Sequence, residues 1–184
     1  MTRRGERRYL RIEIVNDDMP FLVDSVAAVI AEAGLVIDRL VHPVVRVERD
    51  AAGGILALPE DASPTVHRES MIYIETDRAD ARQRRDLHAA LETTLADVRV
   101  AVADWPKMVE AMEADADRID DGEGADLLRW FAGGMLTQLG HVTRRRDGTP
   151  GDLLGICKRD ARDLLSDASY QRAFEAFDAR LAAG

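Results

Sequence analysis

The residues best suited to hold a small polar molecule lie between an alternating segment, residues 9–16, and a segment with helical spacing. They are Asn16, Asp17, Asp18, Met19, Pro20 and Phe21. A helix N-terminus exposes unpaired N–H groups and partial positive charge, which attract a carboxylate, and an aspartate would hold an ammonium group. The stretch therefore predicts an amino-acid site. The alternative is that Asp17 or Asp18 simply caps the helix.

His42 is the second candidate for this site. It lies beside Pro43 in a predicted strand, and it would line the same site from the edge strand of a partner subunit. A solvent-exposed or hydrogen-bonded structural histidine is the other interpretation of this residue.

Catalytic constellations are absent from the sequence. No Ser, His and Asp fall in a nucleophile motif, no P-loop occurs, and GEGADL at 122–127 lacks the third glycine of a dinucleotide fingerprint. The four histidines have no partner at metal-ligand spacing, and the single cysteine, Cys157, lies in an apolar run. We therefore predict no catalytic residue, no metal and no cofactor bound by this chain.

The composition limits which classes of partner the chain can have. The 184 residues are 46% hydrophobic and 32% charged, so a buried core is expected. The net charge of −9 and the aromatic content of 5% argue against nucleic acid. No apolar stretch approaches the ~20 residues of a membrane helix, and the start lacks a signal-peptide core. We predict a cytoplasmic protein without membrane contact, with a basic leader at residues 1–8.

Hydrophobic periodicity predicts six elements in the first hundred residues. They are a strand at 9–16, a helix at 20–33, a strand at 36–49, a strand at 70–77, a helix at 80–96 and a strand at 98–103. The order β-α-β-β-α-β predicts an α+β, ferredoxin-like fold with two helices on one face of an antiparallel sheet. Its usual strand order, 4-1-3-2, makes the second strand an edge. Pro43 supports this, because proline is confined to edges and bulges.

The chain changes character after Trp105. We expect a helix at 106–119, a linker at 120–124, a short helix at 125–132, a hairpin formed by 136–146 and 152–159, and a helix at 169–182. The predicted organisation is a leader at 1–8, a first domain at 9–105, a connecting helix and linker at 106–121, and a partial helix–hairpin–helix unit at 122–184.

Four segments together resemble a known family. They are NDDMPFLVDSV at 16–26, HPVVRVERDAAGGIL at 42–56, ESMIYIETDR at 69–78 and DVRVAVADWPKM at 97–108. In order and spacing they resemble the N-terminal region of the large bacterial NAD-specific glutamate dehydrogenases, which is built from ACT-like modules. TQLGHVTRRRDG at 137–148 and LLGICKRD at 153–160 extend the resemblance.

The resemblance implies a much longer parent enzyme that deaminates L-glutamate oxidatively to 2-oxoglutarate, with its catalytic and NAD-binding residues outside this chain. ACT modules commonly bind amino acids at interfaces. Those that do typically have a glycine just after Asp-x-Pro in the first loop, where this sequence has Phe21. This departure moves the expectation from an amino-acid sensor toward a scaffold.

Several functions stay open at this point. The first is a non-catalytic regulatory and assembly fragment of such an enzyme, in contact with its other domains and subunits, homo-oligomeric and open to an amino-acid effector. The second is a ligand-free oligomerisation module, which would use the edge of the second strand and the sheet face around Tyr9, Val15, Met71 and Tyr73. A free-standing amino-acid-binding protein or a small independent enzyme is the remaining alternative.

Overall fold

The computed structural model describes residues 9–119, 122–159 and 167–183, in two compact units that meet in sequence at Arg99 and Val100. The predicted leader, 1–8, lies outside the described residues, as do the first two residues of the predicted linker. The strands are β1 (Leu10–Asp17), β2 (Ile37–Val41), β3 (Val44–Arg49), β4 (Ile55–Ala57), β5 (Val66–Thr76), β6 (Gly140–Arg144) and β7 (Pro150–Gly155). The helices are α1 (Leu22–Glu32), α2 (Ala81–Ala116), α3 (Gly122–Trp130) and α4 (Asp167–Ala183), with a π-helical turn at Phe131–Met135 and a 3-10 turn at Ile156–Lys158.

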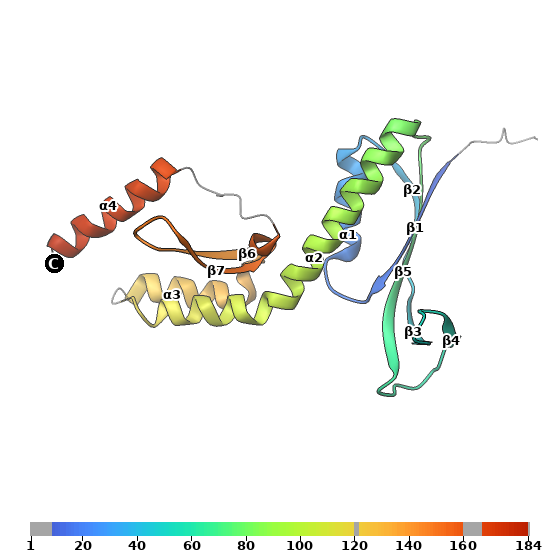
Figure 1. The fold of residues 1–184 in the computed structure, drawn as a ribbon, viewed down its shortest axis with the longest axis horizontal. Helices are drawn as coiled ribbons and strands as arrows, with labels where there is room; N and C mark the ends of the chain where they lie inside the picture. Colours follow the sequence, from blue (N-terminus) through green and yellow to red (C-terminus); the bar gives the residue numbers. More distant parts are fainter. Residues whose placement is uncertain (1–8, 120–121, 160–166, 184) are drawn as a thin grey trace, which may run out of the picture. The chain divides into compact units, whose positions relative to one another are not determined.

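The first unit is an antiparallel sheet centred on β5 (Figure 1). β1 pairs with one side of β5, while β2 and β3 pair with the other, and β4 adds to β3. The predicted second strand, 36–49, is thus two strands, and Pro43 lies in the break between them, where its carbonyl accepts the Met71 N–H at 2.9 Å. β2 is an edge as predicted, but β4 pairs with the end of β3.

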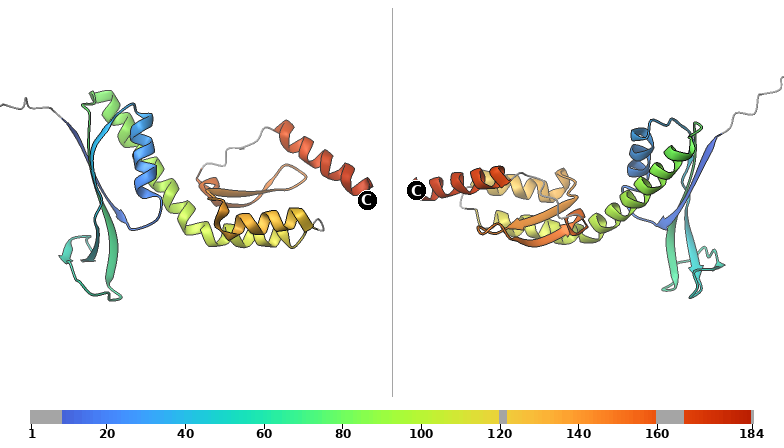
Figure 2. Two further views of the ribbon diagram at one scale, coloured as in Figure 1. Left: turned by 180° about the vertical axis from the view of Figure 1, so that it is seen from behind. Right: turned by 45° about the horizontal axis from the view of Figure 1, so that its top comes forward.

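Both helices of this unit lie against one face of the sheet (Figure 2). The apolar face predicted for residues 20–33 supplies Leu22, Val26 and Ile30 to the core, each at most 1% exposed. These side chains pack with Ile72 and Ile74 of β5 and with Leu87 and Leu91 of α2. Alternation along β5 and helical spacing along α1 therefore build one core of apolar side chains.

The prediction of a fourth strand at 98–103 is wrong. These residues continue α2, which runs unbroken from Ala81 to Ala116 and includes Pro106. The predicted helices at 80–96 and 106–119 are therefore parts of one helix. The six-element β-α-β-β-α-β order is not completed, and the observed class is α+β with an antiparallel sheet.

One ion pair ties β3 to β5 on the sheet. Glu69 is 6% exposed and accepts two hydrogen bonds from the guanidinium of Arg49, at 2.6 and 2.7 Å. The Arg49 hydrogen bond is the main reason that the pKa of Glu69 lies below its ordinary value, against the opposing effect of burial.

The second unit contains the predicted hairpin, as β6 and β7, and the predicted final helix, as α4. The short helix expected at 125–132 begins at Gly122. Among the described residues, no helix combines the length and apolar character needed to cross a membrane.

Candidate functional site

The loop after β1 is fixed to β5 by Asp18. Its backbone N–H donates to the Arg68 carbonyl at 2.9 Å, and its carboxylate accepts the Ser70 hydroxyl at 2.9 Å. The Arg68 guanidinium lies 3.0 Å from the same carboxylate. Asp18 is thus held by the sheet and does not cap α1, whose N-cap residue is Phe21 without a side-chain cap. The capping alternative for Asp17 and Asp18 is wrong.

Arg99 binds the other two polar side chains of this loop region, those of Asn16 and Asp17. Its guanidinium donates to the Asn16 amide oxygen and to the Asp17 carboxylate. The prediction missed Arg99 because it fell in the expected fourth strand. The signal was nevertheless present, because Leu87, Leu91 and Leu95 continue at helical spacing into Val98.

Phe21 occupies a backbone conformation that favours glycine. Its φ of 69° and ψ of −2° lie in the left-handed region, and it is the one described non-glycine residue with positive φ. Its side chain is 44% exposed. The position therefore has a backbone conformation that glycine adopts readily, but it carries an exposed phenyl ring.

Phe21→Gly is expected to be more stable than Phe21→Ala by about 1 kcal/mol. Both variants lose the ring, and only glycine adopts φ near 69° without crowding its own Cβ. Urea unfolding of the two variants measures the difference. An alanine variant as stable as the glycine variant would show that the conformation at this position costs nothing.

His42 lies in the break between β2 and β3. Val41 is opposite Tyr73 and Val44 is opposite Ser70, so the register brings His42 alongside Ile72 of β5. The Nε2 atom of His42 is buried and has no hydrogen-bond partner among the described residues. Met19 is half-buried and packs against the apolar core, and Pro20 is exposed. Neither residue has a polar side chain to offer a ligand.

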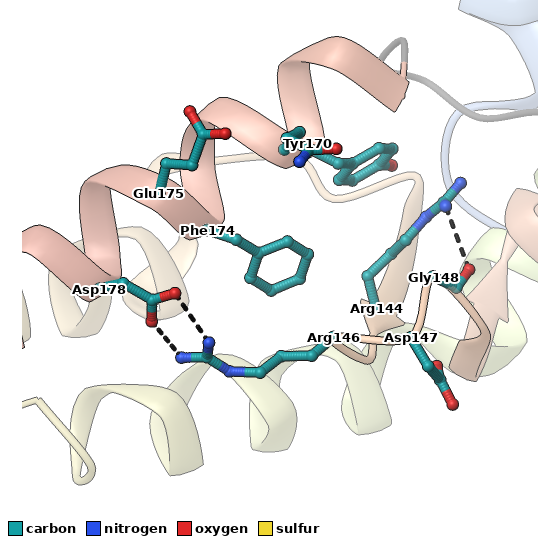
Figure 3. A pocket seen from close by; sticks show the side chains of 9 residues that line it. Arg144, Arg146, Asp147, Gly148, Tyr170, Phe174, Glu175 and Asp178 are labelled. Atoms are coloured by element: carbon teal, nitrogen blue, oxygen red, sulfur yellow. Dashed lines mark hydrogen bonds and ion pairs between the residues drawn. The ribbon is translucent and has the colours of Figure 1, made fainter.

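The second unit holds a hollow between the β6–β7 hairpin and α4 (Figure 3). Its volume is about 420 Å³. Arg146 pairs with Asp178 of α4, and the Arg144 guanidinium lies 4.1 Å from the Tyr170 ring centroid. Phe174 points from α4 into the hollow. The guanidinium groups of Arg144 and Arg146 therefore hold the hairpin against α4.

A buried carboxylate joins α2 to the end of β7. Asp104 is 4% exposed, accepts the Gly155 N–H at 2.9 Å and lies 2.5 Å from the Lys158 ammonium. The hydrogen bond from Lys158, followed by that from Gly155, holds the pKa of Asp104 below its ordinary value of 3.8. Sequence periodicity alone gave no reason to expect this contact.

The second unit should lose stability in acid partly through Asp104. A carboxyl whose pKa is lower in the folded state stabilises the fold above the ordinary value, and this contribution is lost as the pH falls below 3.8 toward the folded pKa. Asp104→Asn should lower the melting temperature at pH 7 and flatten its fall as the pH drops below 3.8. Asp147 and Asp178 also have lowered pKa values, so part of the dependence should remain.

The first unit therefore defines a class: a small α+β domain with an antiparallel sheet and two helices on one face. Residues 3–91 match the family described as glutamate dehydrogenase, ACT1 domain. The NAD-specific glutamate dehydrogenase of Halomonas elongata is 32% identical over 144 residues, which is 71% of this chain and 9% of that protein. That of Pseudomonas aeruginosa is 38% identical over 123 residues, 65% of this chain and 7% of that protein.

These matches confirm the resemblance found in the sequence. The chain corresponds to an N-terminal region of the NAD-specific glutamate dehydrogenase family. It spans less than a tenth of the length of these two relatives.

Proposed function

We propose that this chain is a non-catalytic, N-terminal assembly module of an NAD-specific glutamate dehydrogenase. The parent enzyme would carry out the NAD-linked oxidative deamination of L-glutamate to 2-oxoglutarate in the cytoplasm. The ACT1 match and the names of the two relatives support this assignment. The partners would be other domains and subunits of the same enzyme.

The state of the first loop favours assembly over ligand sensing. An amino-acid ligand needs free acceptors for its ammonium group and free N–H groups for its carboxylate. Arg99 already binds Asn16 and Asp17, and β5 already binds Asp18. The side chains of Asn16, Asp17 and Asp18 are thus already paired within the chain, which leaves no free carboxylate for the ammonium group, and this observation carries the proposal.

Amino-acid sensing is the second candidate, because the buried His42 Nε2 is a polar group that a ligand would satisfy. Thermal shift and calorimetry with a panel of amino acids at millimolar concentration separate the two functions. We expect no heat and no shift. A ligand at about 100 times its dissociation constant would add about 2.7 kcal/mol of stability. That result would support a sensor.

Two controls sharpen this experiment. Phe21→Gly removes the ring from the loop, so binding by this variant alone would identify Phe21 as the group that blocks a ligand site. The chain incubated with NAD and L-glutamate is expected to produce no NADH absorbance at 340 nm. Turnover would place catalytic residues inside this chain and contradict the proposed function.

A further inference from the structure

Among the described strands, β1 is an open edge of the sheet. In the predicted 4-1-3-2 order a fourth strand would lie beside the first, but residues 98–103 belong to α2 instead. Within the described part of the chain, the eight residues of β1 pair with β5 alone. The side of β1 away from β5 therefore presents its backbone groups to whatever lies beside it.

The register shows which groups these are. The Asp18 N–H donates to the Arg68 carbonyl of β5. Backbone groups of alternate residues point to the same side of an antiparallel strand, so even-numbered residues of β1 face β5. The N–H and C=O groups of Arg11, Glu13 and Val15 face the open edge.

A groove follows this edge. It has a volume of about 310 Å³ and is lined by β1 and by α2. The lining residues are Leu10, Arg11, Ile12 and Glu13 of β1, and Arg84, Leu87, His88 and Leu91 of α2. The helix-side residues of β1, Leu10, Ile12 and Ile14, are only half-buried, whereas Ile72 and Ile74 of β5 are at most 2% exposed. One more strand beside β1 would complete the burial of its apolar side chains.

The sequence of β1 is complementary to itself about Ile12. When two copies run antiparallel with Ile12 opposite Ile12, Arg11 of each copy lies opposite Glu13 of the other. Tyr9 and Val15, which are 40% and 58% exposed, also lie opposite each other. The two outward-facing Arg11–Glu13 pairs would exchange about four backbone hydrogen bonds.

Neighbouring registers lack this match. A register centred on Arg11 places the two arginines opposite each other, and one centred on Glu13 does the same for the two glutamates; like charges directly opposite destabilise a strand pair. A register centred on Ile14 would pair Arg11 with Asp17, which already binds Arg99. Among these four registers, the one centred on Ile12 matches charge, apolar surface and outward-facing backbone groups together.

We propose that β1 pairs antiparallel with β1 of a second copy of this chain in the register centred on Ile12, so that one sheet runs through both copies. This inference rests on the proposed assembly function and gives it a specific surface. The occupant is a second copy because the edge is matched to its own sequence in both charge and apolar surface.

Charge reversal in the 184-residue chain tests the pairing. Sedimentation over a concentration series at physiological ionic strength should show a dimer for the wild type. Arg11→Glu and Glu13→Arg each turn two attractive cross-strand pairs into repulsive ones, and each should weaken the dimer by about tenfold or more. An equimolar mixture of the two variants should associate again, because every pair between unlike copies has opposite charges. The double variant R11E/E13R should also dimerise.

A proline variant supplies an independent measurement. Glu13→Pro removes an outward-facing N–H and leaves the hydrogen bonds to β5 in place, so it should abolish the dimer while far-ultraviolet circular dichroism is unchanged.

Of the two charge reversals, Glu13→Arg is the cleaner, because it keeps the 3.7 Å contact between Arg11 and Glu75.

Three results would overturn the proposal. A monomeric wild type would leave the edge to another segment of the parent enzyme. A dimer that neither charge reversal weakens would have its interface elsewhere, and a mixture of the two variants that fails to associate would exclude the charge pairing. Amino-acid binding would contradict the proposed function, and it is detected as a change in melting temperature. It would not change how association depends on the charges at positions 11 and 13. The two failures are therefore distinguishable.

Discussion

Gly155→Ala is expected to destabilise the second unit by about 3 kcal/mol or more. Gly155 has φ 59° and ψ −137°, a conformation that side-chain-bearing residues avoid. A Cβ built there would lie 2.2 Å from the Leu139 carbonyl oxygen, a backbone atom that cannot rotate away. The shift needed to relieve this overlap would also break the hydrogen bond from Gly155 to the buried Asp104. Urea unfolding followed by tryptophan fluorescence measures the loss, because both tryptophans, Trp105 and Trp130, lie in this unit.

Gly148→Ala is the matched control for this substitution. Gly148 also has positive φ, 81°, but a Cβ added there would meet nothing within 4 Å, so only the backbone preference of about 1 kcal/mol is lost. Equal losses for the two variants would show that the contact between Gly155 and Leu139 does not constrain the unit.

Local hydrophobic periodicity was sufficient to predict many of the strands and helices of the first unit. Alternation predicted β1 and the greater part of β5, since each has one face in the core and the other outside it. The spacing of Leu22, Val26 and Ile30 predicted α1 for the same reason. These elements satisfy one pattern throughout their length, so the sequence and the packing agree.

Residues 98–103 show where local patterns are ambiguous. Val98, Val100 and Val102 alternate as a strand would, and β-branched residues favour strands. The helix nevertheless continues, and Ala101 and Met108 are at most 6% exposed along it. The decision depended on packing between distant residues, which a six-residue window does not contain.

The candidate site shows the same limit. The loop 16–21 was found from residue types at the start of a helix, but the groups that occupy it come from elsewhere in the chain. Ser70 and Arg68 reach Asp18 from β5, and Arg99 reaches Asn16 and Asp17 from α2. Sequence reasoning identified side chains able to bind a ligand, whereas in the fold these side chains bind Ser70, Arg68 and Arg99.

The pairing of β1 with β5, on which the proposed edge depends, can be tested from inside the core. Ile74→Ala is expected to destabilise the first unit by about 2–5 kcal/mol. Ile74 is fully buried and lies in register between Ile12 of β1 and Leu40 of β2, so its truncation leaves a cavity beneath both neighbours. Hydrogen exchange with mass spectrometry should show faster exchange across all three strands.

Ile55→Ala is the control for that experiment. Ile55 lies in β4 and is 52% exposed, so its truncation should change the free energy of unfolding by about 0.5 kcal/mol or less. Because β1 is held in the sheet only through β5 among the described strands, Ile74→Ala should also weaken association through the β1 edge, whereas Ile55→Ala should leave it unchanged. If Ile74→Ala loosened β2 while β1 kept its protection and its dimer, β1 would be anchored by contacts other than its ladder with β5.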